Sequence, residues 1–242
     1  MKDFKRHIGN LELVVEYCSG GDLRKLYGEE GKGTLSWGSE PHTQFYTACA
    51  AMAVQYLHDK AFIYRDLKPD NLVVDGSGWC KLTDLGLAKQ LVEPRPGCGR
   101  VWLLFGVLGV SKLAEDKAYA STVCGSVLYM APEMLRKDAQ YDRSVDWWAL
   151  GILIYELSFG LTPFFDYNQQ KVVNSIRRGL KEDSYPPECH GSLKSLLRHV
   201  LRKKPSERLQ GLRALEEVDF FQNFDWPALK EQRLKPPYQP QH

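Results

Sequence analysis

Two short polar runs of the chain hold side chains whose types and spacing could carry out phosphoryl transfer. Asp66, Lys68 and Asn71 fall within the eight residues 64–71, and Asp84 follows thirteen residues after Asn71. Transfer of a phosphoryl group needs a carboxylate that takes the hydroxyl proton, a cation on the moving phosphate and oxygen ligands for Mg²⁺. We therefore predict Asp66 as the base, Lys68 as the cation, and Asn71 and Asp84 as the ligands of Mg²⁺.

The composition argues against several other classes of protein. The net charge of the 242 residues is +2, too small to indicate nucleic acid or an acidic membrane as the main partner. Six cysteines without a C-x-x-C pair argue against a zinc site and predict a cytoplasmic setting, with the nucleus as the alternative. The longest apolar stretch, Val101–Val110, is about half of the roughly 20 residues that span a bilayer, so no membrane span is expected. The basic run Arg202–Lys204 is interpreted as a solvated helix end.

The elements that must position the polar runs can be predicted from apolar spacing. Residues 11–17 are expected to form a strand that ends at a Ser-Gly-Gly breaker. Residues 41–60 are expected to form an amphipathic helix. Its predicted apolar face holds Phe45, Cys49, Met52, Ala53, Tyr56 and Leu57. The strands 72–74 and 79–82 flank Asp75-Gly76-Ser77-Gly78, which predicts a hairpin directly after the catalytic run.

The second half of the chain is expected to be mainly helical. Residues 145–157 are apolar on nearly every side, which is typical of a helix in the middle of a core. Residues 193–201 repeat the three-and-four spacing of a second helix, and the tail from Pro227 is expected to be extended on the surface. The fold class predicted from these elements is α+β, mostly α.

The motifs resemble those of the eukaryotic protein kinases. Tyr64–Asn71 reads as the family's H-R-D-L-x-x-x-N catalytic loop, and Asp84-Leu85-Gly86 as its D-F-G element. Ala131-Pro132-Glu133 is similar to A-P-E, and the aromatic and proline-rich residues after Phe220 follow the start of an AGC-type tail. The resemblance covers about residues 11–240. It implies the larger lobe of a Ser/Thr kinase that uses ATP and Mg²⁺ on protein substrates.

The resemblance also implies positions that bind nucleotide and substrate. Glu16 and Cys18 resemble the hinge that reads adenine, with Val15 as a small gatekeeper. Val73 and Asp22 are placed among the cofactor-binding residues on the same ground. Asp22 and Asp70 match acidic positions that bind arginines before the phosphoacceptor, which implies substrates with basic residues there; the bland alternative for both is an ordinary surface acid.

A phosphorylation site and three buried structural residues follow from the same resemblance. Thr122 lies in a stretch similar to AGC activation loops and implies an upstream activating kinase, with Arg65 and Lys89 as the cations that receive the phosphate. Ser126 replaces a threonine and keeps the hydroxyl that bonds the catalytic residues and favours Ser/Thr substrates. Glu133 is implied to pair with Arg208, and Asp146 to brace the catalytic-loop backbone or to cap its own helix.

The chain departs from the kinase pattern at its start. The glycine-rich loop, the strand lysine and the helix glutamate of the smaller lobe are not found before residue 11. We expect residues 1–18 to be a remnant of that lobe with its fifth strand and hinge. Residues 19–221 are expected to form the larger lobe, and residues 222–242 to begin the C-terminal tail. Activity of this chain alone is accordingly expected to be weak.

A second departure is an insert at about residues 94–117, which lengthens the segment between Asp84 and Thr122. It is either a regulatory or docking insert or unspliced or misassembled sequence, and the second interpretation is favoured because the segment is apolar and the smaller lobe is missing as well. The chain as a whole is either a protein kinase or a catalytically inert, kinase-like binding module. A small-molecule phosphotransferase is a weaker third interpretation.

Overall fold

The computed structural model describes residues 3–7, 10–28, 33–91, 127–136 and 141–240. Its fold is α+β and mostly α, as predicted. The helices are α1 (Leu23–Tyr27), α2 (Glu40–Asp59), α4 (Ser144–Phe159), α5 (Gln169–Arg178), α6 (Gly191–Val200), α7 (Leu212–Glu216) and α8 (Trp226–Lys230). The strands are β1 (Asp3–His7), β2 (Asn10–Val14), β3 (Gly21–Asp22), β4 (Phe62–Ile63), β5 (Leu72–Val74), β6 (Cys80–Leu82) and β7 (Lys89–Gln90). Short 3-10 turns are η2 (Pro69–Asn71), η4 (Pro132–Leu135), η5 (Glu182–Ser184), η6 (Pro205–Glu207) and η7 (Asp219–Phe221).

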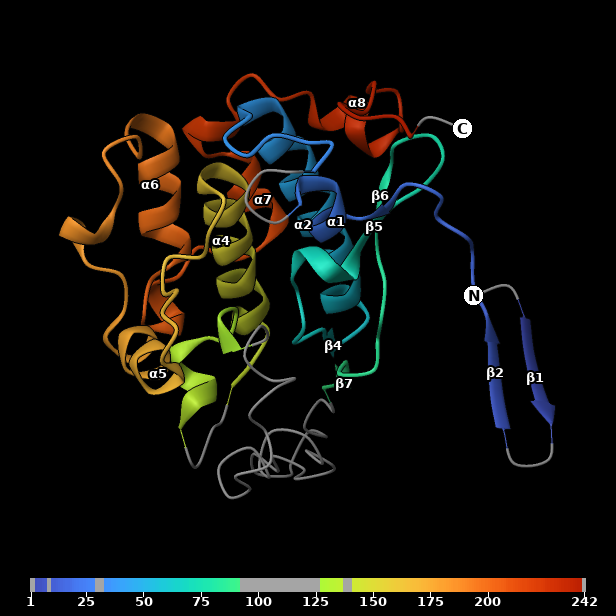
Figure 1. The fold of residues 1–242 in the computed structure, drawn as a ribbon, viewed down its shortest axis with the longest axis horizontal. Helices are drawn as coiled ribbons and strands as arrows, with labels where there is room; N and C mark the ends of the chain where they lie inside the picture. Colours follow the sequence, from blue (N-terminus) through green and yellow to red (C-terminus); the bar gives the residue numbers. More distant parts are fainter. Residues whose placement is uncertain (1–2, 8–9, 29–32, 92–126, 137–140, 241–242) are drawn as a thin grey trace, which may run out of the picture.

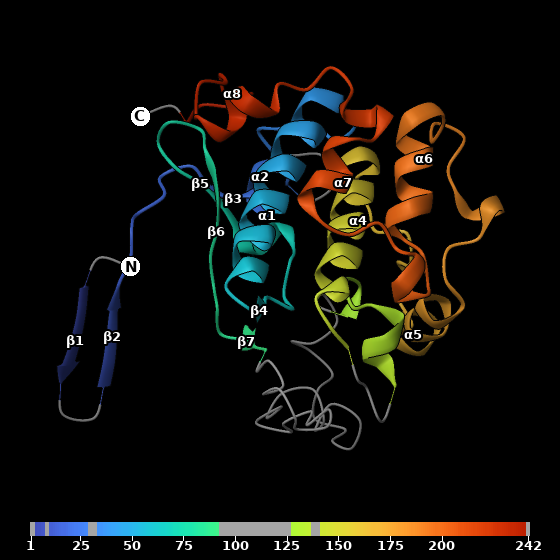
Figure 2. The same ribbon diagram turned by 180° about the vertical axis from the view of Figure 1, so that it is seen from behind.

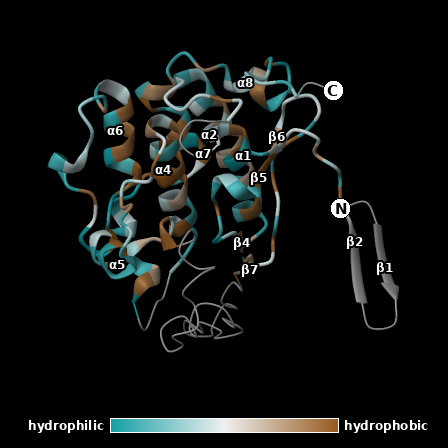
Figure 3. Cartoon of the chain, viewed as in Figure 1, coloured by the Kyte–Doolittle hydropathy of each residue, from teal (hydrophilic) through white to brown (hydrophobic). Residues whose placement is uncertain are grey.

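Helices α2 and α4 lie side by side at the centre of the molecule, and α6 packs against α4 (Figure 1). The predicted central helix is confirmed, because all thirteen residues of α4 from Val145 to Leu157 are buried. Figure 3 shows hydrophobic residues along this helix. A helix that is apolar on all sides is stable only where every side meets protein, so α4 organises the core.

The predicted helix over 41–60 is present as α2, but its predicted apolar face is only partly right. Tyr56 is 63% exposed, whereas Tyr46, Ala50 and Val54 are fully buried. These three residues follow one another at steps of four, so they define the side of α2 that faces the core. The small alanines let the neighbouring elements approach this side closely, which a search for large apolar residues does not detect.

The predicted hairpin after the catalytic run is confirmed. Strands β5 and β6 pair antiparallel, and β3 joins β5 to complete a three-stranded sheet. The turn is fixed by Asp75, whose Oδ1 accepts hydrogen bonds from the backbone N–H groups of Ser77 and Trp79 at 2.9 and 3.0 Å. Strands β4 and β7 form a separate pair, so the segments before and after the two polar runs are held together.

The N-terminal part forms a hairpin of β1 and β2, which stands apart from the helical body (Figures 1 and 2). The predicted strand over 11–17 is confirmed for residues 11–14 only, and β1 was not predicted. The gatekeeper expectation for Val15 is wrong in this structure, because its side chain is 66% exposed and Tyr17 beside it is 85% exposed. A gatekeeper side chain must be enclosed, whereas that of Val15 is largely open to solvent.

The tail was predicted to be extended from Pro227, which is wrong for its first turn. Residues 226–230 form α8, with Ala228 and Leu229 buried and the Asp225 carboxylate accepting the Ala228 N–H at 2.9 Å. Beyond α8 the chain is irregular and lies against the turn of the β5–β6 hairpin (Figure 2). Within the described part of the chain, no helix has the length and apolar character required to cross a membrane.

Candidate active site

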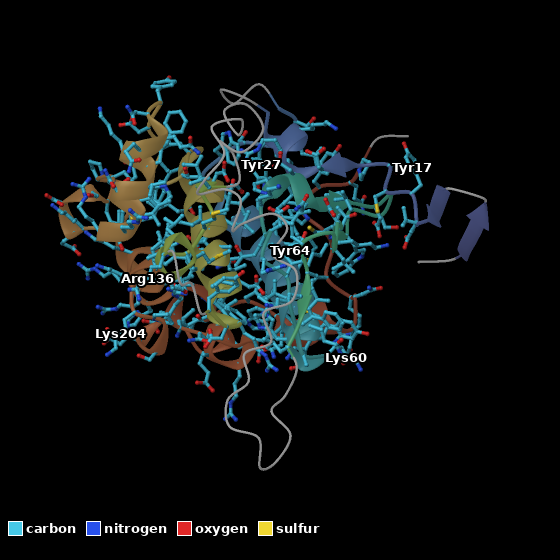
Figure 4. The ribbon with its side chains drawn as sticks, turned by 90° about the horizontal axis from the view of Figure 1, so that it is seen from below. Tyr17, Tyr27, Lys60, Tyr64, Arg136 and Lys204 are labelled. Carbon is cyan, nitrogen blue, oxygen red and sulfur yellow. The ribbon has the colours of Figure 1, made fainter. Side chains whose placement is uncertain are left out.

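The polar run after β4, residues 64–71, contains both buried and accessible side chains, and the buried ones hold its backbone in place. Tyr64 and Leu67 are fully buried, whereas the side chains of Asp66 and Lys68 remain partly accessible. Between them Arg65 has a φ of +72°, a left-handed conformation that is unusual for a residue with a side chain. Tyr64 and Leu67 therefore anchor the run in the core, while the side chains of Asp66 and Lys68 point outward. Figure 4 shows Tyr64 near the middle of the molecule.

The structure brings Asp66, Lys68 and Asn71 together. The Lys68 ammonium donates to both carboxylate oxygens of Asp66, at 3.0 and 2.9 Å. The Asn71 side-chain nitrogen donates to the Asp66 carbonyl and to its Oδ2, both at 2.8 Å. Because the nitrogen of Asn71 is used in this way, its amide oxygen is the end that can bind a cation.

The second carboxylate, Asp84, is joined to the catalytic run through the residue before it. Thr83 donates its N–H to the Asn71 carbonyl at 3.0 Å and accepts the Tyr64 hydroxyl at 2.6 Å. Asp84 is exposed, and its Oδ1 accepts the Gly86 N–H at 2.9 Å. A Cβ at Gly86 would lie 2.9 Å from that oxygen, so glycine lets the turn close around the carboxylate.

The surroundings of Tyr64 disfavour ionisation of its hydroxyl group. Burial raises the pKa of Tyr64, and the negative charges of Asp66, Asp84 and Asp146 raise it further. Leu85 stands where the D-F-G element has its phenylalanine, and its side chain is 58% exposed. Leu85 therefore fills no part of the described core.

Asp146 holds the catalytic-loop backbone, the position that the resemblance implied. Its carboxylate is fully buried and accepts the N–H groups of Tyr64 and Arg65 at 2.9 and 2.7 Å. It also contacts His58 Nε2 at 2.7 Å. These bonds offset the left-handed conformation of Arg65, and no side-chain bond of Asp146 caps α4. The sequence reasoning missed His58, although it stands four residues after Val54 on the buried side of α2.

Glu133 and Arg208 form a buried two-armed ion pair. Arg208 donates to the two Glu133 oxygens at 2.7 and 3.0 Å and to the Ser144 carbonyl at 2.8 Å. Its guanidinium lies 5.1 Å from the centre of the Trp148 ring. The pair thus ties η4 to the first turn of α4 and has no accessible group with which to react.

Two of the residues predicted to bind nucleotide, Asp22 and Val73, pair in the small sheet, and Glu16 and Cys18 precede it in the chain. Gly20 donates to the Val74 carbonyl at 2.9 Å, and Asp22 is opposite Val73 in the β3–β5 pair. Cys18 lies just before this pair, where burial raises the pKa of its thiol. The Glu16 carboxylate is 2.6 Å from the Lys81 ammonium. Backbone pairing therefore connects the residues directly after the predicted hinge to the strand that follows Asn71.

Asp22 and Asp70, predicted to bind substrate arginines, are engaged with cations of the chain itself. Asp22 accepts the Lys25 N–H at 2.8 Å as the N-cap of α1, and its Oδ2 is 3.0 Å from Lys25 Nζ. Asp70 is 3.5 Å from the Nε of Arg24. Arg24 was not singled out in the sequence, because nothing in its local spacing shows that it reaches another segment.

Arg65 and Lys89, predicted to receive a phosphate, lie on neighbouring segments. Arg65 donates to the Leu87 carbonyl at 2.7 Å and to the Tyr141 hydroxyl at 3.0 Å. Lys89 is opposite Ile63 in the β4–β7 pair. Thr122, Ser126 and the insert at about 94–117 lie outside the described residues.

The donor set fits a magnesium–nucleotide complex better than a metal held by protein alone. In the described ranges, no group of three or more His, Cys, Asp or Glu residues could hold a metal ion. Mg²⁺ keeps several waters and is usually held by one or two carboxylates together with substrate phosphates. An exposed Asp84 and an amide oxygen of Asn71 match that requirement. Two described surface hollows, one lined by Phe165 and Tyr167 and one by Arg136 and Lys204, involve neither residue.

Comparison with known proteins gives one family and several relatives. The protein kinase domain family matches residues 1–221. The chain is 36% identical over 232 residues to serine/threonine-protein kinase N2 of Danio rerio, which covers 94% of the chain and 21% of that protein. It is 34% identical over 234 residues to the human cAMP-dependent protein kinase catalytic subunit PRKX, covering 95% of the chain and 56% of that protein. It is 34% identical over 235 residues to serine/threonine-protein kinase SCH9 of Saccharomyces cerevisiae, covering 96% and 25% respectively. The chain thus spans between about a fifth and just over half of these relatives.

Proposed function

The chain belongs to the protein kinase family, in its AGC-type serine/threonine branch, and from this premise we propose that it transfers the γ-phosphate of ATP to hydroxyl groups of proteins. The observation that supports the proposal most directly is the bonded set of Asp66, Lys68 and Asn71, linked through Thr83 to Asp84. Phosphoryl transfer depends mainly on positioning and charge, and this set supplies both.

Each residue of the set has a proposed role. Asp66 accepts the proton of the substrate hydroxyl, and Asn71 orients it through the two bonds from its side-chain nitrogen. Lys68, already beside Asp66, neutralises charge on the moving phosphate. Asp84 and the oxygen of Asn71 would hold Mg²⁺, which neutralises negative charge on the nucleotide when bound.

Further proposals concern domains, regulation and location. The β1–β2 hairpin supports residues 1–18 as a separate N-terminal unit, and the packed α8 supports residues 222–242 as a tail on the lobe 19–221. Arg65 and Lys89 support control by phosphorylation of Thr122 through an upstream kinase. The scattered cysteines support a cytoplasmic location.

A second candidate function is a kinase-like binding module without catalytic activity. It is favoured by one observation: the 242 residues contain no G-x-G-x-x-G sequence that would cover the phosphates. Such a module would keep the fold and the surface but have little affinity for MgATP, so nucleotide binding separates the two candidates.

The test compares thermal stability with and without MgATP for the wild type, Asp84→Asn and Asp66→Asn, together with transfer of labelled phosphate to protein substrates. Ligand at 100 times its Kd stabilises a protein by about 2.7 kcal/mol. We expect stabilisation of the wild type, none for Asp84→Asn, and stabilisation without transfer for Asp66→Asn. The control is Asp183→Asn, an exposed aspartate of η5. Absence of stabilisation of the wild type at millimolar MgATP would exclude the kinase proposal and favour the binding module.

A further inference from the structure

Arg24, on α1, connects three segments that are far apart in the sequence. Its Nη1 is 2.6 Å from Glu156 Oε1 on α4, and its Nε is 3.5 Å from Asp70 Oδ2 on η2. Its Nη2 donates to the Tyr129 hydroxyl at 2.7 Å, and that hydroxyl in turn donates to the other carboxylate oxygen of Glu156. Every nitrogen of the guanidinium is therefore directed at an oxygen of another segment.

The burial of Glu156 makes it costly for Arg24 to leave this carboxylate. The Glu156 side chain is only 4% exposed, whereas Arg24 is 33% exposed. A buried carboxylate without a partner is costly, so Glu156 needs a cation beside it. In the part of the chain that the structure describes, Arg24 is the cation within 4 Å of it.

Arg24 lies beside the two acids that are expected to bind arginines of a substrate. Asp70 lies in the catalytic run, two residues after Lys68, and Asp22 caps the helix that carries Arg24. Asp22 and Asp70 are the acids expected to attract arginines of a substrate. In the structure, each of these acids already contacts a cation of the chain, Lys25 for Asp22 and Arg24 for Asp70.

We propose that Arg24 takes, from within the chain, the place that a substrate arginine would occupy, so the site does not select basic residues before the phosphoacceptor. The inference rests on the proposed kinase function and specifies its substrate class: protein segments without a required arginine. It replaces the expectation of basic-directed selectivity with neutral or non-selective recognition at this position.

Mass action supports the proposal. A side chain attached next to its binding site has an effective concentration in the millimolar range or above, on the order of that for short flexible linkers. A peptide arginine at micromolar concentration competes poorly with it. The planar fork of Arg24 also bonds a carboxylate, a hydroxyl and a second carboxylate at once, which a lysine in its place could not reproduce.

The test uses two peptides that differ only in arginine or citrulline before an alanine that replaces the phosphoacceptor. Binding of both is measured by fluorescence anisotropy, without nucleotide, to the wild type and to Arg24→Met. We expect the wild type to bind the two peptides within about twofold of each other. Arg24→Met should bind the arginine peptide about tenfold more tightly than the citrulline peptide, as expected for a hydrogen bond between charged groups. Arg213→Met, which removes an arginine that is 92% exposed, should behave as the wild type.

Three outcomes would overturn the inference. A wild type that already prefers the arginine peptide by about tenfold would show that Arg24 leaves the acids available. A folded Arg24→Met that binds both peptides equally, or neither of them, would show that the acids do not recognise arginine. If Arg24→Met does not fold, the double variant Arg24→Met with Glu156→Gln removes the buried charge together with its partner, and equal binding by that variant also contradicts the inference.

The outcome is separable from the proposed catalytic activity. Neither peptide can accept a phosphate, so the ratio of the two affinities is obtained even if the chain transfers none. Failure of phosphate transfer with the expected change of ratio in Arg24→Met would leave the inference intact and reject the kinase activity alone.

Discussion

Tyr64 donates its hydroxyl hydrogen to the backbone carbonyl of Thr83 at 2.6 Å. This bond joins the first residue of the catalytic run to the residue immediately before Asp84. Together with the bond from the Thr83 N–H to the Asn71 carbonyl, it fixes both polar runs at one place. The side-chain hydroxyl of a tyrosine thus determines where the second carboxylate lies relative to the first.

Tyr64→Phe should therefore loosen Asp84 without removing any group that contacts a nucleotide. One hydrogen bond contributes roughly 0.5–1.5 kcal/mol, so we expect a loss of about 1 kcal/mol in the free energy of unfolding. MgATP should stabilise the variant less than it stabilises the wild type, because the carboxylate is less well positioned. Urea denaturation and thermal shift measure the two effects.

The control for this prediction is Tyr56→Phe, which removes the hydroxyl of a tyrosine that is 63% exposed on α2. It should leave both the unfolding free energy and the MgATP shift unchanged. An equal loss of nucleotide stabilisation in the two variants would contradict a positioning role for Tyr64.

Breaking the pair of Glu133 and Arg208 should have the larger effect on stability. Removing one partner of a buried pair leaves an uncompensated charge and costs roughly 3–5 kcal/mol. We expect this loss for Arg208→Ala, measured by urea denaturation. Arg213→Ala breaks an exposed pair with Glu217 and should cost no more than about 0.5 kcal/mol. Similar losses of unfolding free energy in both variants would show that the buried pair of Glu133 and Arg208 stabilises the fold no more than an exposed pair does.

The local motifs of the site could be predicted from the sequence because their residues are neighbours in the chain. Asp66, Lys68 and Asn71 lie within six residues, and a strand and a 3-10 turn around them suffice to bring their side chains together. The hairpin of β5 and β6 was predictable for the same reason, because Asp75 and its glycines determine a turn within four residues.

The contacts that join distant segments could not be predicted from spacing. Arg24 is 132 residues from Glu156, and neither residue has a local pattern that marks its partner. The helix α8 was missed because a proline-rich tail usually stays extended, although here Pro227 lies in the first turn of the helix and Asp225 caps it. Tertiary packing decides such cases, and composition alone does not reveal it.

The dependence of stability on pH can be predicted for Glu182. Hydrogen bonds from Arg198 and then Lys194 lower the pKa of this carboxyl from 4.5 to about 2. A lowered pKa means that the folded state favours the charged form, so the stabilisation is present above about pH 4.5 and disappears as the pH falls toward 2. Glu182→Gln should therefore be less stable than the wild type at pH 7 and approach it near pH 2.

Unfolding by urea over this pH range measures the difference in stability between the wild type and Glu182→Gln. Added salt should reduce this difference because the ion pair of Glu182 with Arg198 is exposed. Glu188→Gln, at another exposed glutamate six residues away, is the control and should show no such convergence. A difference between the wild type and Glu182→Gln that is independent of pH would contradict the assignment of the bonds to the charged carboxylate.

Docking of the C-terminal tail can be tested at Gly78, in the turn between β5 and β6. Its φ is +91°, and a Cβ there would lie 2.1 Å from the Tyr238 carbonyl oxygen and 2.8 Å from the Pro236 Cβ. Gly78→Ala should therefore combine backbone strain with displacement of the tail. Gly21 of the same sheet is a matched control, since its φ is +76° and nothing lies within 4 Å of a Cβ placed on it.

Both alanine variants should lose about 1–2 kcal/mol of stability to the left-handed backbone, because that conformation is unfavourable for a residue with a side chain. Only Gly78→Ala should also expose the tail. Limited proteolysis followed by mass spectrometry should show faster cleavage after α8 in that variant than in the wild type or in Gly21→Ala, because a tail released from the hairpin is open to the protease. Equal cleavage rates in the three proteins would mean that contact with Gly78 does not hold the tail in place.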